Sequence, residues 1–242
     1  MPGFFFYLLS IYKLMFSIVV PLFNESKNII PLLKEIESSL KDYDNYEIVL
    51  INDSSTDNTA NVIENIKNEN IKIINNIDNK GQSYSIHKGI GLSLNEIIIT
   101  LDGDGQNDPR DIPKLLDLYF RNDKIKLVGG IRKKRQDSFI KIFSSKIANY
   151  IRSKILNDNC KDTGCSLKVF SKNIFLEFPY FDGMHRFLPA LFKGYSYQTT
   201  FIEVNHRKRK FGVSKYGTFN RLFKGIKDII RVKGIINNYK KI

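Results

Sequence analysis

The chain has 242 residues, of which 42% are hydrophobic, and these figures fit a soluble protein built as one large α/β domain or as a domain with an appendage. Its two cysteines, Cys160 and Cys165, have the spacing of neither a disulfide framework nor a zinc site, so they indicate a reducing cytosol. No segment of the sequence is long and apolar enough to span a bilayer, which predicts a soluble or peripheral protein.

The formal net charge of +13 at pH 7 is divided unevenly along the chain. Residues 1–120 contain 10 Lys and Arg against 17 Asp and Glu, a charge of −7, whereas residues 121–242 contain 28 against 8, a charge of +20. This division separates an acidic half, suited to a metal ion, from a half suited to anions. Nucleic acid, an anionic membrane and the phosphates of a substrate are the candidate anions.

Residues 1–15 form an apolar extension that is interrupted by Lys13. It has neither the basic region nor the small-residue cleavage site of a signal peptide. Two interpretations stay open. Either this extension contacts a membrane, or translation starts at Met15, directly before the first predicted strand.

Short apolar runs alternate with helical patterns in the first half of the chain. The runs that predict buried strands lie at 16–22, 46–51, 71–74 and 97–101. The helical patterns between them continue to about residue 41, from residues 52–55 to about 67, and from 81 to about 94. Strands that alternate with helices and are buried on both faces predict a parallel, doubly wound sheet.

Three of these predicted strands end in polar side chains. Asn24 and Glu25 follow the first strand, Asp53 follows the second, and Asp102 and Asp104 follow the fourth. Open α/β sheets bind ligands at the carboxyl ends of their strands, and carboxylates so close together suit a hard divalent cation that holds a diphosphate. An isolated Asp-x-Asp is more often an ordinary turn. The prediction of a cation site therefore rests on the polar residues at all three strand ends, which a parallel sheet brings together.

The second half continues the alternation with more basic residues. Asp108 has the position of an N-cap, with Pro109 as the first residue of a helix to residue 120. The elements that follow are a strand at 126–131, a cationic loop at 132–135, a helix at about 139–156, a strand ending near 170, a helix at 184–193, a strand at 195–204 and a basic segment at 206–216.

The tail at 218–242 has the pattern of an amphipathic basic helix. Its apolar side chains share one face, and most of its basic side chains lie off that face. The apolar residues are Leu222, Phe223, Ile226, Ile229 and Ile230. This pattern is typical of a helix in an anionic membrane interface. A helix packed on the protein core, with a solvated basic face, is the alternative.

In this order, the motifs resemble those of the family 2 glycosyltransferases with a GT-A fold. Within that family they are similar to the polyprenyl-phosphate transferases of the dolichol-phosphate mannose synthase type. The resemblance covers roughly residues 16–235 and rests on VPLFNE at 20–25, NDSSTDNT at 52–59, NKG at 79–81, DGDGQ at 102–106, DTGC at 162–165 and GVSKY at 212–216. It implies an α/β, Rossmann-like catalytic domain at 16–217, with a mostly parallel sheet flanked by helices, followed by the helical tail.

The resemblance also implies a binding role for most of the matched positions. Asp53 would bind the base of the nucleotide, and Asp102 would contact the ribose or the sugar. Asp102, Asp104 and Gln106 would hold Mg²⁺ or Mn²⁺ with the donor diphosphate. The remaining residues of the implied nucleotide-sugar site are Pro21, Phe23, Glu25, Lys80 and Gly81. One departure is Ser54, at a position where family members usually have glycine.

The cations of the second half favour a phosphate acceptor. The resemblance implies that Arg132, Arg209 and Lys215 hold the donor and acceptor phosphates. A polyprenyl phosphate is already an anion and needs no general base, whereas a sugar hydroxyl requires a carboxylate or His within hydrogen-bond reach. The only plausible bases in this half are Asp162, Asp182 and His185.

We therefore expect a metal-dependent, inverting glycosyltransferase that moves a hexose from a GDP- or UDP-linked donor to a polyprenyl phosphate. It would be peripheral on the cytoplasmic face of the membrane. An integral-membrane partner would complete it, because relatives have C-terminal spanning helices and this chain ends at Ile242. Transfer to a sugar hydroxyl of a cell-surface polysaccharide is the alternative, in which Asp182 would act as the base.

Two other classes fit less well. The +20 half is suggestive of a nucleic-acid-binding protein, but the acidic strand ends and the absence of a recognised nucleic-acid motif argue against one. A nucleotidyltransferase with the same fold would carry a glycine-rich, basic loop straight after the first strand, where this chain has Phe23-Asn24-Glu25-Ser26.

Overall fold

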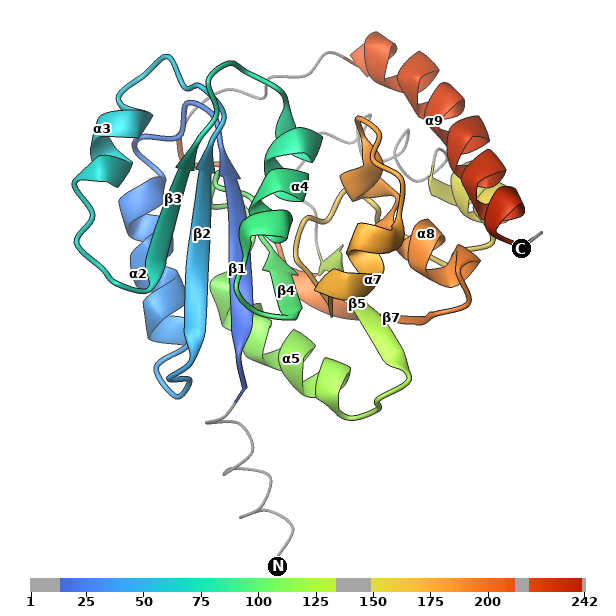
Figure 1. The fold of residues 1–242 in the computed structure, drawn as a ribbon, viewed down its shortest axis with the longest axis horizontal. Coiled ribbons are helices and arrows are strands. Elements are labelled where there is room, and N and C mark those ends of the chain that lie inside the picture. The colour runs from blue at the N-terminus through green and yellow to red at the C-terminus, as the bar shows by residue number, and fades with distance from the viewer. Residues whose placement is uncertain (1–13, 134–148, 212–217, 241–242) are drawn as a thin grey trace, which may run out of the picture.

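The computed structural model describes residues 14–133, 149–211 and 218–240. A seven-stranded sheet crosses these residues, with helices on both of its faces (Figure 1). The strands are β1 (Phe16–Leu22), β2 (Tyr46–Asn52), β3 (Ile71–Asn75), β4 (Ile97–Thr100), β5 (Ile125–Lys133), β6 (Lys168–Ser171) and β7 (Gln198–Asn205).

The strand order is β3-β2-β1-β4-β6-β5-β7, and the sheet is mostly parallel, as predicted. β1 lies between β2 and β4 and is parallel to both, β3 is parallel to β2, and β7 is parallel to β5. Only β6 runs the other way, antiparallel to β4 and β5. The carboxyl ends of β1, β2 and β4 therefore meet at one edge of the sheet.

The helices are α2 (Ile29–Ser39), α3 (Thr59–Glu64), α4 (Gln82–Leu92), α5 (Ile112–Phe120), α7 (Lys172–Glu177), α8 (Leu188–Gly194) and α9 (Thr218–Tyr239). Residues 149–156 are helical as well. Two 3₁₀ turns, η1 (Pro109–Asp111) and η2 (Met184–Arg186), lead toward α5 and α8. The side chain of Asp108 accepts a hydrogen bond from the backbone N of Arg110, so the predicted cap at this position is confirmed.

The core lies on both faces of the sheet because alternate residues of each central strand point to opposite sides. Ile18 and Val20 of β1 pack in one cluster with residues of α2 and α5, whereas Val19 packs in a second cluster with residues of α4, α7 and α8. This two-sided burial explains why the strands read as continuous apolar runs.

Several boundaries differ from those predicted. α3 begins only at Thr59, because Asp57 accepts hydrogen bonds from its N and Oγ1 and the residues before it form a loop. β7 begins at Gln198 instead of residue 195, because Ser196 has a φ of 66° and ends the turn after α8. α7 was not predicted; the hydroxyl of Ser171 caps it by accepting from Ile174 N at 3.4 Å.

The tail helix is present as α9, and it packs on the core through one side. Val232 and Ile236 are buried against α8, and the Tyr239 ring stacks on Tyr195 at 3.8 Å. Ile226 and Ile230 remain exposed, and the side chains of Leu222 and Phe223 lie outside the described residues. Among the helices that the structure describes, none has the length and apolar character to span a membrane.

Candidate active site

The loops after β1 and β2 are joined by hydrogen bonds. The backbone N of Asp53 donates to Leu22 O at 2.8 Å, and the backbone N of Asn24 donates to Ser55 Oγ at 3.0 Å. Asn24 and Ser54 both have a φ of 56°, in the left-handed region that favours glycine. Ser54 therefore adopts a backbone conformation that glycine takes without strain. A serine at this position is strained, whereas related motifs usually have glycine there.

Asp53 is buried, and its carboxylate organises the loop that follows β3. It accepts hydrogen bonds from the backbone N of Lys80 at 3.0 Å, the backbone N of Gly81 at 2.8 Å, and Asn76 Nδ2 at 2.8 Å. The structure thus brings Asp53, Lys80 and Gly81 together, as the sequence predicts. Lys80 takes part through its backbone, because its ammonium group pairs with Asp78 at 2.8 Å in solvent.

The loop after β4 carries the two predicted metal-binding carboxylates. Asp102 Oδ1 accepts from Gln82 Nε2 at 2.8 Å, and Asp104 Oδ1 accepts from the backbone N of Gln106 at 3.0 Å. A Cβ atom on Gly103 would lie 2.4 Å from Leu22 Cδ2 and 3.1 Å from Pro21 O. A side chain between the two carboxylates would therefore require Leu22 and the end of β1 to shift, which favours glycine at this position.

The electrostatics of this loop fit a divalent cation. Burial, together with the neighbouring charge of Asp104, raises the pKa of Asp102 to about 6; a bond with Ser166 and the charges of Lys168 and Arg132 act in the opposite direction. Two close carboxylates and an amide form an oxygen-only donor set, which suits Mg²⁺ or Mn²⁺. Among the residues that the structure describes, no group of three or more His, Cys, Asp and Glu side chains has the arrangement of a metal site, either in this loop or elsewhere.

The remaining donor-site predictions fall on the same edge. Pro21 and Phe23 are half-buried at the end of β1. Glu25 is buried, and its Oε2 accepts from Asn28 Nδ2 at 2.6 Å. These side chains and the Asp102 loop therefore border one region beyond the strands.

Arg132, at the end of β5, is held by Asp162. Its Nε and Nη2 donate to the two carboxylate oxygens, both at 2.7 Å, and its backbone N donates to Asp162 Oδ2 at 3.1 Å. A Cβ on Gly164 would lie 2.7 Å from Arg132 Nη2, so a side chain at this position would displace the guanidinium group from its place beside Asp162. Asp162, one of the plausible bases, is therefore the bidentate partner of an arginine.

Arg209 joins the basic half of the chain to the acidic half. Its Nη2 lies 2.6 Å from Asp104 Oδ2, and its Nη1 lies 3.6 Å from Glu25 Oε1. Three predicted site residues from distant parts of the sequence thus meet. Lys215, the third predicted phosphate-binding cation, lies outside the described residues.

The segment with Asp182 and His185 is fixed to the first turn of α4. Ser83 Oγ accepts from the backbone N of Gly183 at 2.7 Å and lies 2.6 Å from His185 Nδ1. Gln82, the residue before Ser83, holds Asp102. Asp182 itself is exposed, and its proposed role as a base stays a prediction.

Sequence reasoning missed Gln82, Ser83 and Lys168. Lys168 is buried on β6, and its charge acts on Asp102. A signal was present for each: a lysine in an otherwise apolar strand is unusual, and two polar residues directly after Gly81 begin a helix at the carboxyl end of β3.

Comparison with known proteins identifies the family of this arrangement. Residues 17–178 match the family described as Glycosyl transferase family 2. The chain is 34% identical over 222 residues to dodecaprenyl-phosphate galacturonate synthase of Rhizobium johnstonii, a match that covers 89% of this chain and 65% of that protein. It is 32% identical over 218 residues to undecaprenyl-phosphate 4-deoxy-4-formamido-L-arabinose transferase of Proteus mirabilis, covering 88% and 66%. The chain thus spans slightly less than two thirds of the length of these relatives.

Solved structures share the fold. Glucosyl-3-phosphoglycerate synthase from Mycobacterium tuberculosis, crystallised with Mn²⁺, uridine diphosphate and glucosyl-3-phosphoglycerate, matches with a TM-score of 0.67 at 13% identity, covering 91% of this chain and 78% of that one. Its complex with Mg²⁺ and uridine diphosphate matches with a TM-score of 0.68 at 12% identity, covering 93% and 81%. The expected GT-A fold is confirmed.

Proposed function

Because the chain belongs to glycosyl transferase family 2, we propose that it is a metal-dependent, inverting glycosyltransferase that moves a hexose from a nucleotide-sugar to a polyprenyl phosphate. The observation that carries the proposal is the contact of Arg209 with Asp104, 2.6 Å apart. It joins carboxylates suited to a cation to arginines suited to phosphates, and both are needed where a diphosphate leaves and a phosphate attacks.

The donor would bind along the carboxyl ends of β1, β2 and β4. Pro21, Phe23 and Glu25 would line the pocket for the base and ribose, and the loop that Asp53 organises would close its other side. Asp102, Asp104 and Gln106 would hold Mg²⁺ or Mn²⁺. The chemistry supplied there by the cation is stabilisation of the negative charge that builds on the leaving nucleoside diphosphate.

The acceptor would be an anion that needs no deprotonation. Asp162 accepts two hydrogen bonds from the guanidinium group of Arg132, so its carboxylate is engaged in orienting a cation. Arg132 and Arg209, with Lys215, would reduce the repulsion between the donor and acceptor phosphates. This arrangement supports a polyprenyl phosphate more directly than a sugar hydroxyl.

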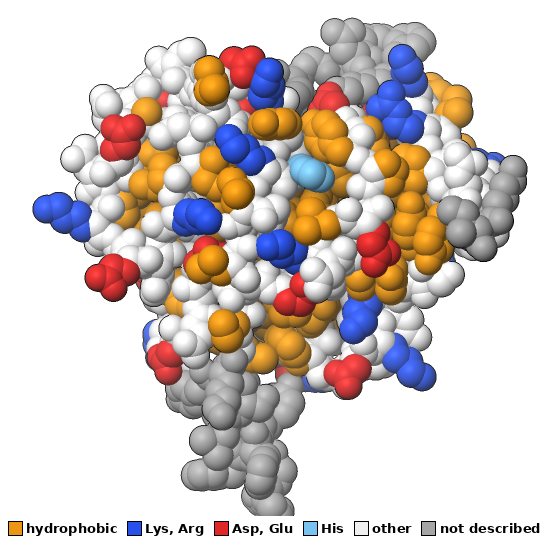
Figure 2. Space-filling view, viewed as in Figure 1, with side chains coloured by type: hydrophobic (Ala, Val, Ile, Leu, Met, Phe, Trp, Pro, Cys, Tyr) orange, Lys and Arg blue, Asp and Glu red, His pale blue; other side chains and the backbone are white. Residues whose placement is uncertain are grey.

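A membrane surface would present this acceptor. Ile226 and Ile230 of α9, with Ile151 and Ile155 of the helix at 149–156, line an apolar groove of about 660 Å³ beside exposed Lys233. Lys and Arg side chains lie beside hydrophobic ones in the region of α9 (Figure 2). Apolar and basic groups side by side suit the interface of an anionic membrane. The cytoplasmic face and an integral-membrane partner remain part of the proposal.

Donor turnover by the purified protein tests the proposal. UDP-glucose, UDP-N-acetylglucosamine, UDP-galacturonate and GDP-mannose are each supplied with Mn²⁺ or Mg²⁺, with and without undecaprenyl phosphate. We expect lipid-dependent release of one nucleoside diphosphate. Asp104→Asn should reduce it by about a hundredfold or more, and Asp117→Asn, a change in an exposed ion pair of α5, should leave it unchanged.

Two other outcomes would redirect the proposal. Donor binding without lipid-dependent turnover would contradict the phosphate acceptor and favour a hydroxyl acceptor, with Asp182→Asn as the next variant. Failure to bind any donor would contradict the proposed donor site itself.

A further inference from the structure

Arg209 lies in a segment beyond the end of β7, outside the sheet. β7 ends at Asn205, so strand pairing no longer fixes the backbone four residues further on. The segment 205–209 instead pairs with the loop of the two carboxylates. The backbone N of Arg207 donates to Gln106 O at 2.9 Å, and Gln106 Nε2 donates to Arg207 O at 3.2 Å. Asn107 forms an isolated antiparallel bridge with the preceding residue of this segment, His206.

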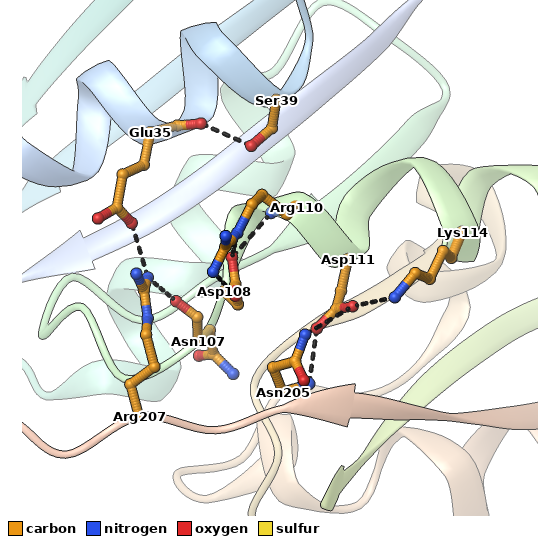
Figure 3. Close-up of polar contacts among 9 residues, drawn as sticks. All are labelled: Glu35, Ser39, Asn107, Asp108, Arg110, Asp111, Lys114, Asn205 and Arg207. Atoms are coloured by element: carbon orange, nitrogen blue, oxygen red, sulfur yellow. Dashed lines mark hydrogen bonds and ion pairs between the residues drawn. The ribbon is translucent and has the colours of Figure 1, made fainter.

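Asp111 anchors the start of this segment. It is fully buried, and its Oδ2 accepts from the backbone N of Asn205 at 2.6 Å (Figure 3). Its Oδ1 accepts from Lys114 Nζ at 2.7 Å. Because η1 holds Asp111 at the start of α5, this carboxylate fixes the last residue of β7 to the helix that follows the proposed metal-binding loop, residues 101–108.

Arg207 fastens the middle of the segment. Its Nη2 donates to Asn107 O and to Glu35 Oε2, both at 2.7 Å (Figure 3). Glu35 lies on α2, which packs against η1. One guanidinium group therefore ties together α2, the metal-binding loop and the segment that leads to Arg209.

The basic side chains near Arg207 are already paired with acidic side chains of the protein. A cavity of about 770 Å³ is lined by Arg110, Lys114, Lys133 and Arg207, together with Asp108, Asp111, Asn205 and His206. Each of these four basic side chains forms an ion pair with an Asp or Glu. The charges are balanced locally, which favours a supporting role for this network over the binding of an anion.

We propose that Arg207 and Asp111 are positioning residues that hold Arg209 at the carboxylates of the donor site. This inference rests on the phosphate-binding role proposed above for Arg209. A displacement of about 1 Å in a binding group can reduce the rate about a hundredfold, so contacts remote from the chemistry control how well Arg209 works.

A double-mutant cycle tests whether Arg207 acts through Arg209. The readout is the dissociation constant of UDP and of GDP, each with Mn²⁺, measured by calorimetry, because binding stays measurable when turnover is lost. We expect Arg209→Ala and Arg207→Ala each to weaken binding by about tenfold or more, as for the loss of a hydrogen bond to a charged group. The double variant should then match Arg209→Ala within about twofold.

Matched variants separate positioning from stability. Arg110→Ala removes a cation of the same network that is 74% exposed and contacts Asp108 only within its own turn, so binding should not change. Glu35→Gln keeps the bond of Arg207 with Asn107 O and should weaken binding less than Arg207→Ala. Asp111→Asn keeps an acceptor for Asn205 N but loses the charge that holds Lys114. Like Arg207→Ala, it should weaken nucleotide binding when Arg209 is present and have no further effect in the Arg209→Ala background.

The outcomes distinguish a failure of the positioning role from a failure of the proposed function. If Arg207→Ala weakens binding by the same factor with and without Arg209, or leaves it unchanged, positioning is contradicted and the proposed function stands. If Arg209→Ala binds as wild type, the role of Arg209 fails and the inference with it. If wild type binds neither nucleotide, the proposed donor site itself is contradicted.

Discussion

The two sides of the candidate site are held by different means. On the side of β3, β2, β1 and β4, the polar groups follow parallel strands, and backbone hydrogen bonds such as those to Asp53 fix them. On the side of β6, β5 and β7, the guanidinium groups themselves are held by ion pairs, Arg132 with Asp162 and Arg209 with Asp104.

This difference follows from the topology. Parallel strands deliver their carboxyl ends to one edge, so the acidic side is fixed by the fold itself. β6 reverses direction, Arg132 lies in the last paired residues of β5, and Arg209 lies beyond the end of β7. The acidic side should therefore respond to changes that disturb the loops, whereas the basic side should respond to the loss of single side-chain partners.

The largest effect is expected where the two sides meet. Asp104→Asn removes a charge that would hold the metal and that contacts Arg209. We expect lipid-dependent turnover to fall by about a hundredfold or more, as when a charge-stabilising group is lost. The thermal midpoint should stay close to that of wild type, measured alongside turnover. A variant with normal turnover would show that this contact is not part of the reaction.

On the basic side, Asp162→Asn should weaken the hold on Arg132 while leaving an acceptor oxygen in place. We expect about a tenfold loss of turnover, because the bidentate ion pair becomes a hydrogen bond from the Arg132 cation to a single neutral amide oxygen. Arg132→Gln, which removes the cation itself, should lose more. Equal turnover of Asp162→Asn and wild type would contradict the dependence of the basic side on this partner.

On the acidic side, Asp53→Asn should reduce stability as well as donor affinity. An asparagine amide would present N–H groups to the backbone N–H groups of Lys80 and Gly81. Leaving one such part-buried donor unpaired costs free energy toward the lower end of the range of about 1–3 kcal/mol that applies to buried donors, measurable as a lower free energy of unfolding in urea. Asp78→Asn, in an exposed pair of the same loop, is the control. A variant as stable as wild type would show that the loop does not depend on this carboxylate.

Outside the site, Ile230→Glu should weaken binding to vesicles that contain anionic lipid, because it places a negative charge among the apolar groups of the groove. Ile230 is 69% exposed, so the unfolding midpoint should hardly change. Leu94→Glu, at another exposed hydrophobic position, serves as the matched control. Co-sedimentation with vesicles measures the difference, and equal loss in both variants would argue against the groove as the membrane contact.

The smallest effect concerns the cysteines. Burial raises the pKa of the Cys165 thiol to about 11, and burial raises the pKa of Cys160 as well. At pH 8 roughly one Cys165 in a thousand is a thiolate, so alkylation of the native protein should be very slow and should become fast only in denaturant. Rapid labelling of two thiols in the native state would show that this part of the core opens readily.

The acidic side could be predicted from the sequence because its signals are local. Buried strands that end in Asn24, Asp53 and Asp102 form a repeated pattern, and parallel strands place those ends together. The strand order β3-β2-β1-β4-β6-β5-β7 could not be predicted from such local signals. A short apolar strand such as β6 has the same residue pattern whether it pairs parallel or antiparallel to its neighbours.

The partners of the basic side were also beyond the reach of sequence patterns. Arg132 and Asp162 are 30 residues apart, and Arg209 and Asp104 are 105 apart, so no periodicity links them. The start of α3 was missed for a different reason. The side chain of Asp57 competes for the first backbone groups and delays the helix, an effect that propensity alone does not reveal.

The position of β4 at the centre of the sheet has a consequence for synthesis on the ribosome. β1 to β4 can pair as soon as residue 100 has emerged, but the other edge of β4 is covered only by β6, at residues 168–171. Until then the nascent chain exposes an apolar strand with unpaired backbone groups, which is a template for aggregation. Chains that stop before residue 168 should therefore need chaperones to stay in solution, and the contact of Arg209 with Asp104 can form only after residue 209 has emerged.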